Sequence, residues 1–81
     1  MVEFDKRAVG AVVRRFRREK GLPQEVLSGL AGLARSHLSM IESGTKQPNF
    51  ETLWRIATAL DIKPHDLVRA IEKEIEKKQG K

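Results

Sequence analysis

The stretch QEVLSGLAGLARSHLSMIES, residues 24–43, decides the fold of this 81-residue chain. Its apolar residues recur at helical spacing on both sides of Gly32, a residue that suits the left-handed turn after a helix. Ser28 is the small residue that a close crossing of two helices needs. The apolar contact positions are Leu27, Ala31, Leu33, Leu38 and Ile41. We predict helices over 24–31 and 35–43, joined by a turn so short that the two helices must cross steeply.

The same spacing predicts three more helices outside this stretch. Asp5 is a suitable N-cap for a helix over 6–20, and Asn49 for one from about residue 50 to residue 60. Pro64 suits the first position of a last helix that continues to about Lys78. No segment alternates between apolar and polar residues as a strand does. We therefore predict one all-α domain of five helices over residues 1–81.

Composition excludes several classes of protein. The chain has no cysteine, so disulfides and thiolate metal sites are ruled out, and neither histidine has a partner at metal-ligand spacing. Ser36, His37 and Glu42 are too close along one helix to face one another as a catalytic triad. No apolar run approaches the roughly 20 residues of a membrane span, and residues 1–10 lack the unbroken apolar stretch that is typical of a signal peptide. We expect a cytoplasmic protein with no enzymatic activity, no metal, no cofactor and no small-molecule ligand.

The charge distribution favours a polyanionic partner. The formal net charge is +5, and residues 1–22 hold seven Lys and Arg against three acidic residues. Residues 23–50 are balanced, with Arg35 and Lys46 against Glu25 and Glu42. A basic surplus gathered in one segment is typical of a nucleic-acid-binding surface.

Four short motifs make the chain resemble the Cro and phage-repressor-type (XRE-like) helix-turn-helix family. They are RREKGLPQ at 17–24, IESG at 41–44, the proline of KQPN at 46–49, and IATALDI at 56–62. The resemblance covers about residues 9–68. It implies a five-helix, lambda-repressor-like domain that regulates transcription, usually as a homodimer on a near-palindromic operator in double-stranded DNA. The small size and the extended last helix, about 64–78, are similar to restriction–modification controller proteins.

The resemblance also implies roles for individual residues. The helix over 35–43 would enter the major groove, and Arg17 would form a structural salt bridge with Glu42. Residues that match base-contacting positions are Arg35, Ser36, Ser39 and Met40. Residues that match backbone-contacting positions are Gln24, Ser43, Thr45 and Lys46. By residue type, we add Arg14, Arg18 and His37 as candidate phosphate contacts.

Two residue types support this assignment physically, and one leaves an alternative open. Arg35 can bond guanine O6 and N7 together, which is worth roughly 1–3 kcal/mol of discrimination. Met40 can lie against a thymine methyl, but methionine also fills gaps at the edge of a core. Pro23 and Ala34 stand where the family usually places a capping Ser or Thr, at a cost of about 1 kcal/mol each.

The last two helices raise the question of a partner chain. Val68, Ile71 and Ile75 form an apolar stripe whose far end has little inside so small a bundle to cover it. We therefore expect a homodimer through this stripe, together with the end of the preceding helix. We expect Trp54 to close the edge of the core, with a dimer contact as the alternative. An alternative function for the same fold is a protein-interaction module or an antitoxin.

Overall fold

The computed structural model describes residues 3–80 and contains five α-helices and no strand within them. The helices are α1 (Lys6–Glu19), α2 (Gln24–Ala31), α3 (Arg35–Ser43), α4 (Phe50–Ala59) and α5 (Pro64–Gly80). The predicted all-α, five-helix class is confirmed. The two central helices begin and end at the residues that their sequence predicts. The predicted ends of α1 and α4 each lie one residue too far, because Lys20 and Leu60 are caps.

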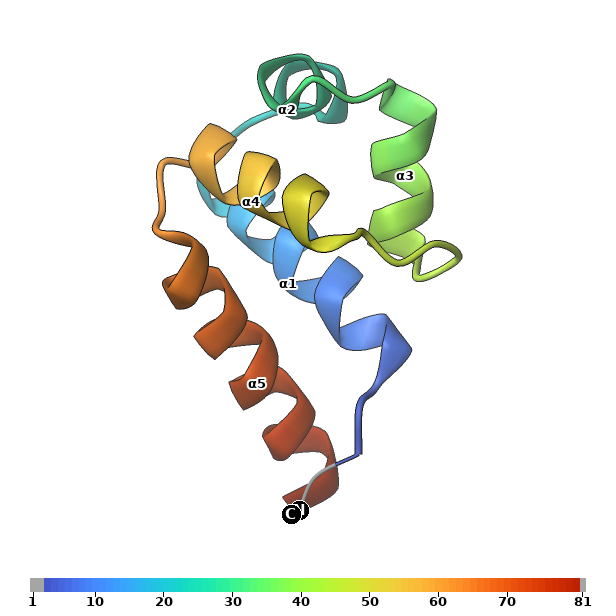
Figure 1. Cartoon of the computed structure of the whole chain (residues 1–81), viewed down its shortest axis with the longest axis vertical. Coiled ribbons are helices and arrows are strands. Elements are labelled where there is room, and N and C mark those ends of the chain that lie inside the picture. Colours follow the sequence, from blue (N-terminus) through green and yellow to red (C-terminus); the bar gives the residue numbers. More distant parts are fainter. Residues whose placement is uncertain (1–2, 81) are drawn as a thin grey trace.

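The helices pack around α1, which crosses the middle of the molecule (Figure 1). It contacts α3 on one side and α5 on the other, while α2 packs on α3 and α4, and α4 packs on α5. The core consists of the apolar stripes that face one another across these contacts. Its fully buried members are Ala8, Val12, Val13, Leu27, Leu38, Ile56, Ala57 and Leu67. No helix within residues 3–80 has the length and apolarity needed to cross a membrane.

Two helices start without a side-chain cap. Asp5 and Asn49 accept hydrogen bonds from the backbone N–H groups of Arg7 and Thr52, as helix N-caps do. Pro23 and Ala34 stand at the starts of α2 and α3 in extended conformation and form no such bond. The turn residue Gly32 has a φ of +71° and ends α2 in the left-handed conformation expected of it.

The expectation that the chain leaves Ile71 and Ile75 uncovered is wrong. Both lie in the protomer's own core, with 6% and 8% of their surface exposed. Because α5 lies along α1, these side chains meet the same cluster as Ala8 and Val12. Polar contacts hold the two segments together: Arg15 pairs with Glu74 at 3.3 Å, and Gln79 Nε2 donates to the Glu3 carbonyl at 2.9 Å. Of the predicted stripe, Val68 alone is exposed, at 43%.

The expectation that Trp54 closes the core is also wrong. Trp54 is 53% exposed and packs edge to face against Phe50, with ring centroids 6.0 Å apart. Phe50 is itself 69% exposed. The solvent side of α4 therefore carries two adjoining aromatic rings, and exposed apolar patches of this kind are typical of interaction surfaces.

Candidate nucleic-acid interface

The exposed side of α3 is polar and faces away from the bundle. Leu38 and Ile41 are buried against the other helices and fix which side that is. Arg35 and Ser36 are exposed at the start of the helix, while His37 and Ser39 are half-buried beside them. Met40 is 39% exposed and lies outside the core cluster. Four of the five side chains on this edge carry hydrogen-bonding groups.

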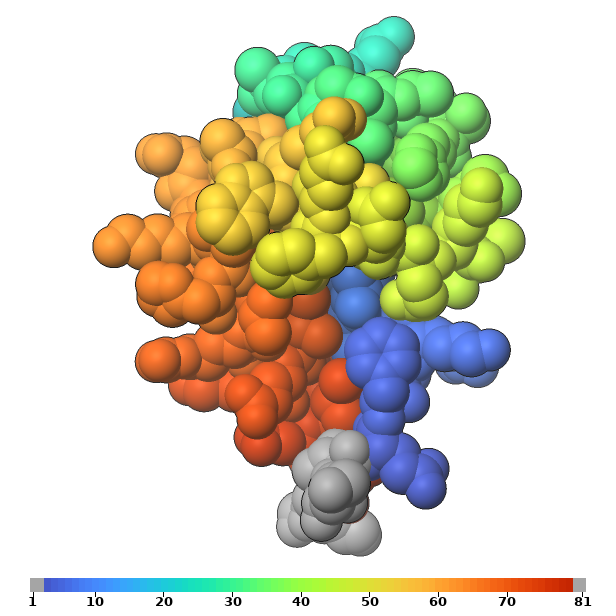
Figure 2. All heavy atoms as spheres, in the orientation of Figure 1, coloured from blue at the N-terminus to red at the C-terminus, as the bar shows by residue number. Residues whose placement is uncertain are grey.

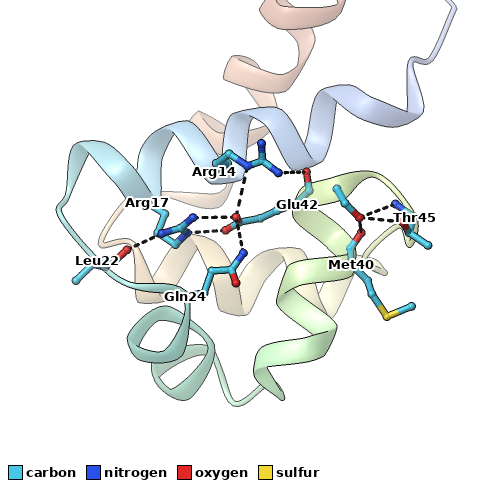
Figure 3. A network of polar contacts seen from close by, with 8 residues as sticks. Arg14, Arg17, Leu22, Gln24, Met40, Glu42 and Thr45 are labelled. Carbon is cyan, nitrogen blue, oxygen red and sulfur yellow. Dashed lines mark hydrogen bonds and ion pairs between the residues drawn. The ribbon is translucent and has the colours of Figure 1, made fainter.

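A buried ion pair fastens the C-terminal turn of α3 to α1 (Figure 3). Arg17 donates to both carboxylate oxygens of Glu42, from Nε at 2.7 Å and from Nη2 at 3.0 Å. Its third nitrogen, Nη1, donates to the Leu22 carbonyl at 2.8 Å, on the link between α1 and α2. Gln24 Nε2, at the start of α2, donates to Glu42 Oε1 at 3.0 Å. One carboxylate therefore ties α3 to α1 and to the first turn of α2.

The surroundings of Glu42 keep its carboxylate ionised. Burial alone raises the pKa of the Glu42 carboxyl, but hydrogen bonds from Arg17 and Gln24 and the positive charges of Arg17 and Arg14 outweigh that effect. The net pKa lies below the ordinary glutamate value, and the pKa of Arg17 is raised by the same hydrogen bond. No buried side-chain N or O atom among the described residues is left without a partner. The pair is therefore fully bonded at neutral pH.

Close approach of α1 and α3 depends on Gly10. A Cβ at this position would lie 2.2 Å from the carbonyl oxygen of Ile41 and 2.6 Å from that of Glu42. Real Cβ atoms do not come so close to another atom, so any side chain here must push the two helices apart. The sequence signal was a single glycine inside an otherwise regular helical pattern, which often marks close packing.

The loop after α3 presents polar groups beside the exposed edge of that helix. Ser43 Oγ lies 2.8 Å from Thr45 Oγ1 and donates to the Met40 carbonyl at 3.1 Å. The backbone N–H of Lys46 donates to the same carbonyl, also at 3.1 Å. These bonds hold the loop against the end of α3, with Ser43, Thr45 and Lys46 all exposed.

Two cations at the start of α1 adjoin this loop, and sequence reasoning did not single them out. Gly44 lies so close to Arg7 that a Cβ on it would be 3.6 Å from Arg7 Cγ. Gln47 Nε2 donates to the Lys6 carbonyl at 2.7 Å. Lys6 and Arg7 therefore stand next to the loop that carries Lys46, which extends a positively charged edge onto α1.

The arginines farther along α1 are divided between internal and exposed roles. Arg14 is half-buried, with Nη2 donating to the Glu42 carbonyl at 3.4 Å and Nε lying 3.7 Å from its carboxylate. Arg18 is exposed, and together with Arg14 and Arg15 it borders a shallow hollow on the outer side of α1. Within the described residues, no group of three or more His, Cys, Asp or Glu side chains is placed to hold a metal ion.

Comparisons with known proteins identify relatives of this fold and sequence. The helix-turn-helix family model HTH_3 matches residues 13–67. The HTH-type transcriptional regulator y4dJ of Sinorhizobium fredii is 38% identical over 63 residues, which cover 78% of this chain and 82% of that protein. Two other matched regulators, DdrOP3 of Deinococcus deserti and SinR of Bacillus subtilis, are longer, and the chain spans about half of their length.

Two solved structures are similar over most of the chain. The restriction–modification controller protein C.AhdI from Aeromonas hydrophila is 40% identical, with a TM-score of 0.75 over 78% of this chain and 96% of that one. The controller protein C.Esp1396I, crystallised as a tetramer with its natural operator, is 29% identical. Its TM-score is 0.82 over 90% of this chain and 96% of its own. These findings confirm the resemblance that the sequence motifs indicated.

Proposed function

The chain belongs to the HTH_3 helix-turn-helix family of DNA-binding transcriptional regulators, and from that premise we propose that it binds a near-palindromic operator as a homodimer. In this proposal residues 1–81 act as one domain, and α3 enters the major groove of each half-site. The observation that supports it best is the division of α3 into two faces. One face is locked to α1 and α2 through Glu42, and the other presents Arg35, Ser36 and Met40 to solvent.

Base recognition in this proposal comes from the exposed edge of α3. Arg35 supplies a paired donor for the major-groove edge of guanine, and Ser36 and Ser39 supply short, less selective hydrogen bonds. Met40 extends beyond the core, so its side chain is free to lie against a thymine methyl. The operator half-site should therefore contain a guanine and a thymine at fixed spacing.

Backbone contacts in this proposal come from both sides of α3. Lys46, Ser43 and Thr45 act from the loop, and Lys6 and Arg7 act from the adjoining start of α1. On the other side Gln24 uses its second N–H group and Arg18 its guanidinium. Arg14 contributes mainly its charge, because its donors already face Glu42, and His37 adds a ring nitrogen near the helix start. Such contacts set orientation without reading sequence.

The homodimer is proposed through the exposed apolar side chains of α4 and α5. Of the three predicted residues Val68 is kept, and Phe50 and Trp54 take the place of Ile71 and Ile75, which the chain itself buries. A two-fold axis through this surface would bring two copies of α4 and α5 together and leave both α3 helices free. C.Esp1396I assembles as a tetramer on its operator, which supports an oligomeric binding form.

Selection from random duplex DNA should enrich a near-palindrome whose half-sites lie about one helical turn apart. Arg35→Ala should cost about 1–3 kcal/mol at the guanine position and leave preferences elsewhere unchanged. Lys46→Ala should lower the affinity for all DNA sequences alike. It should also reduce the slope of the logarithm of the binding constant against the logarithm of the salt concentration by about one. Mobility shifts at several salt concentrations measure both effects. If no sequence is enriched over nonspecific binding, the operator proposal fails and a protein-interaction role becomes the better account.

Sedimentation should show the mass of the protein rising from one to two chains with concentration. Trp54→Ser should weaken this association by about 2 kcal/mol, roughly thirtyfold, because a buried tryptophan is a typical hot spot of an interface. Val26→Ser, at another exposed apolar residue, is the matched control and should associate like the wild type. A mass of one chain up to high concentration would exclude the homodimer, and equal association of Trp54→Ser and wild type would exclude this interface.

A further inference from the structure

A groove along α5 shares only Val68 with the surfaces proposed above for DNA binding and dimer formation. It lies between α5 and the segment before α1, which runs beside the lower half of that helix (Figure 2). Its volume is about 700 Å³, within the range of sites that hold ligands. Ile71 and Ile75 form the floor, and Phe4 and Val68 stand at the sides.

The side walls of the groove are apolar and open to water. Phe4 is 62% exposed and Val68 is 43% exposed. Burial of apolar surface is worth about 25 cal/mol per Å², so covering these walls together with the floor would be favourable. The groove therefore offers a binding surface for apolar side chains.

The rim of the groove is acidic, against the trend of the chain. Glu3, Glu72 and Glu76 line it, and among residues 3–80 no lysine, arginine or histidine does. None of these three carboxylates forms an ion pair with another residue of the segment 3–80, whereas the neighbouring Glu74 pairs with Arg15 and Lys78. On a protein with a net charge of +5, this rim repels phosphate and attracts cations.

We propose that this groove binds a cationic amphipathic helix of a partner protein. Apolar side chains of that helix would fill the floor, and its lysines and arginines would pair with the glutamates of the rim. From Val68 to Glu76 the groove follows α5 for about 12 Å, at about 1.5 Å per residue, which matches two turns of a docked helix.

The position of the groove leaves it accessible while α3 is occupied. The α5 helix packs on α1 and α4, whereas α3 packs on α1 and α2. DNA lying on α3 would not cover the rim at Glu72 and Glu76. Val68 belongs to the proposed dimer surface as well, and the rest of the groove extends from there toward the end of α5. The groove is therefore a separate surface through which a DNA-bound regulator can hold a protein.

A designed peptide tests this inference on the intact protein. The probe is an acetylated and amidated helix of about 15 residues, with leucines on one face and lysines on either side of them. Its control carries glutamate in place of each lysine. Titration should shift the amide NMR signals of Phe4, Val68, Glu72 and Glu76 with the lysine peptide and leave them unmoved with the glutamate peptide. Equal binding of the two peptides, or shifts that map elsewhere, would overturn the proposal.

Matched variants separate the groove from general charge effects. The double variant Glu72→Gln/Glu76→Gln should weaken peptide binding about fivefold, while Glu19→Gln/Glu25→Gln, with the same change in net charge, should stay within about twofold. Phe4→Ala should weaken binding, and Leu30→Ala, at a similarly exposed residue, should not. Operator binding should be the same in all four variants, because none of them changes a proposed DNA contact. The peptide titration does not use DNA, so it can be interpreted even if the operator proposal fails. If Glu72→Gln/Glu76→Gln instead alters sedimentation of the protein alone, a second copy occupies the groove and the proposal is wrong.

Discussion

Replacing Glu42 by alanine should lower the free energy of unfolding by about 3–5 kcal/mol, because it leaves the Arg17 guanidinium buried without its counter-ion. The Arg17 side chain is only 11% exposed, so water cannot replace the lost carboxylate. The variant also removes the acceptor of Gln24, which frees the start of α2. Urea unfolding monitored by circular dichroism measures the change, with the m-value checked for constancy.

The control for this change is a salt bridge of the same residue types at the surface. Glu51 accepts from Arg55 at 3.0 Å on α4, and its side chain is 72% exposed. Glu51→Ala should therefore change stability by no more than about 0.5 kcal/mol. A loss below about 1 kcal/mol for Glu42→Ala would show that the buried pair is not what holds α3 in place.

The same pair gives the protein an acid dependence whose direction follows from the pKa of Glu42. That pKa is lower in the folded chain than the ordinary value of 4.5, so the pair contributes fully at neutral pH. Its contribution falls as the pH drops below the ordinary value and is lost once the pH passes the folded value. The free energy of unfolding of the wild type should therefore fall as the pH is lowered through this range. In the Glu42→Ala variant the free energy of unfolding should depend less on pH over the same range.

Helix α3 could be predicted from sequence, because local signals agree there. Apolar spacing fixed which side of α3 is buried, and Gly32 marked the turn. The pairing of Arg17 with Glu42 came only from the family resemblance, since residues 25 positions apart carry no local sign of contact. The contact is nevertheless present in the structure at 2.7 Å.

The predictions that failed depend on how helices pack. A stripe pattern shows which residues of α5 are apolar, but the side of the stripe that meets α1 depends on the crossing angle. Ile71 and Ile75 fell on the covered side and Val68 on the open side. The apolar spacing of residues 50–60 does not decide whether Trp54, next to Leu53, faces the core or solvent. Its actual exposure follows from the rotation of α4 about its own axis.

Gly10→Ala should destabilise the protein by about 3 kcal/mol, although alanine favours a helix over glycine by about 1 kcal/mol. The added methyl group would meet two backbone carbonyls of α3, at 2.2 Å and 2.6 Å, and backbone cannot rotate away as a side chain can. Relief requires α1 and α3 to separate. That separation loosens the core around Ile41 and lengthens the bonds between Arg17 and Glu42.

A second alanine variant isolates the steric cause. Gly29 lies in α2 with nothing within 4 Å of an added Cβ, so Gly29→Ala should stabilise the protein by about 0.5–1 kcal/mol. The two variants make the same chemical change inside helices. Stability changes of opposite sign would therefore show that the contact of residue 10 with α3 causes the loss. Thermal and urea unfolding of both proteins measure it. Gly10→Ala removes no proposed DNA-contacting group, but it displaces the end of α3. The folded variant should therefore also lose its preference for the operator sequence. Equal stabilisation by both substitutions would mean that α1 and α3 do not need the close approach at Gly10. The close packing of the two helices would then not explain the orientation of α3.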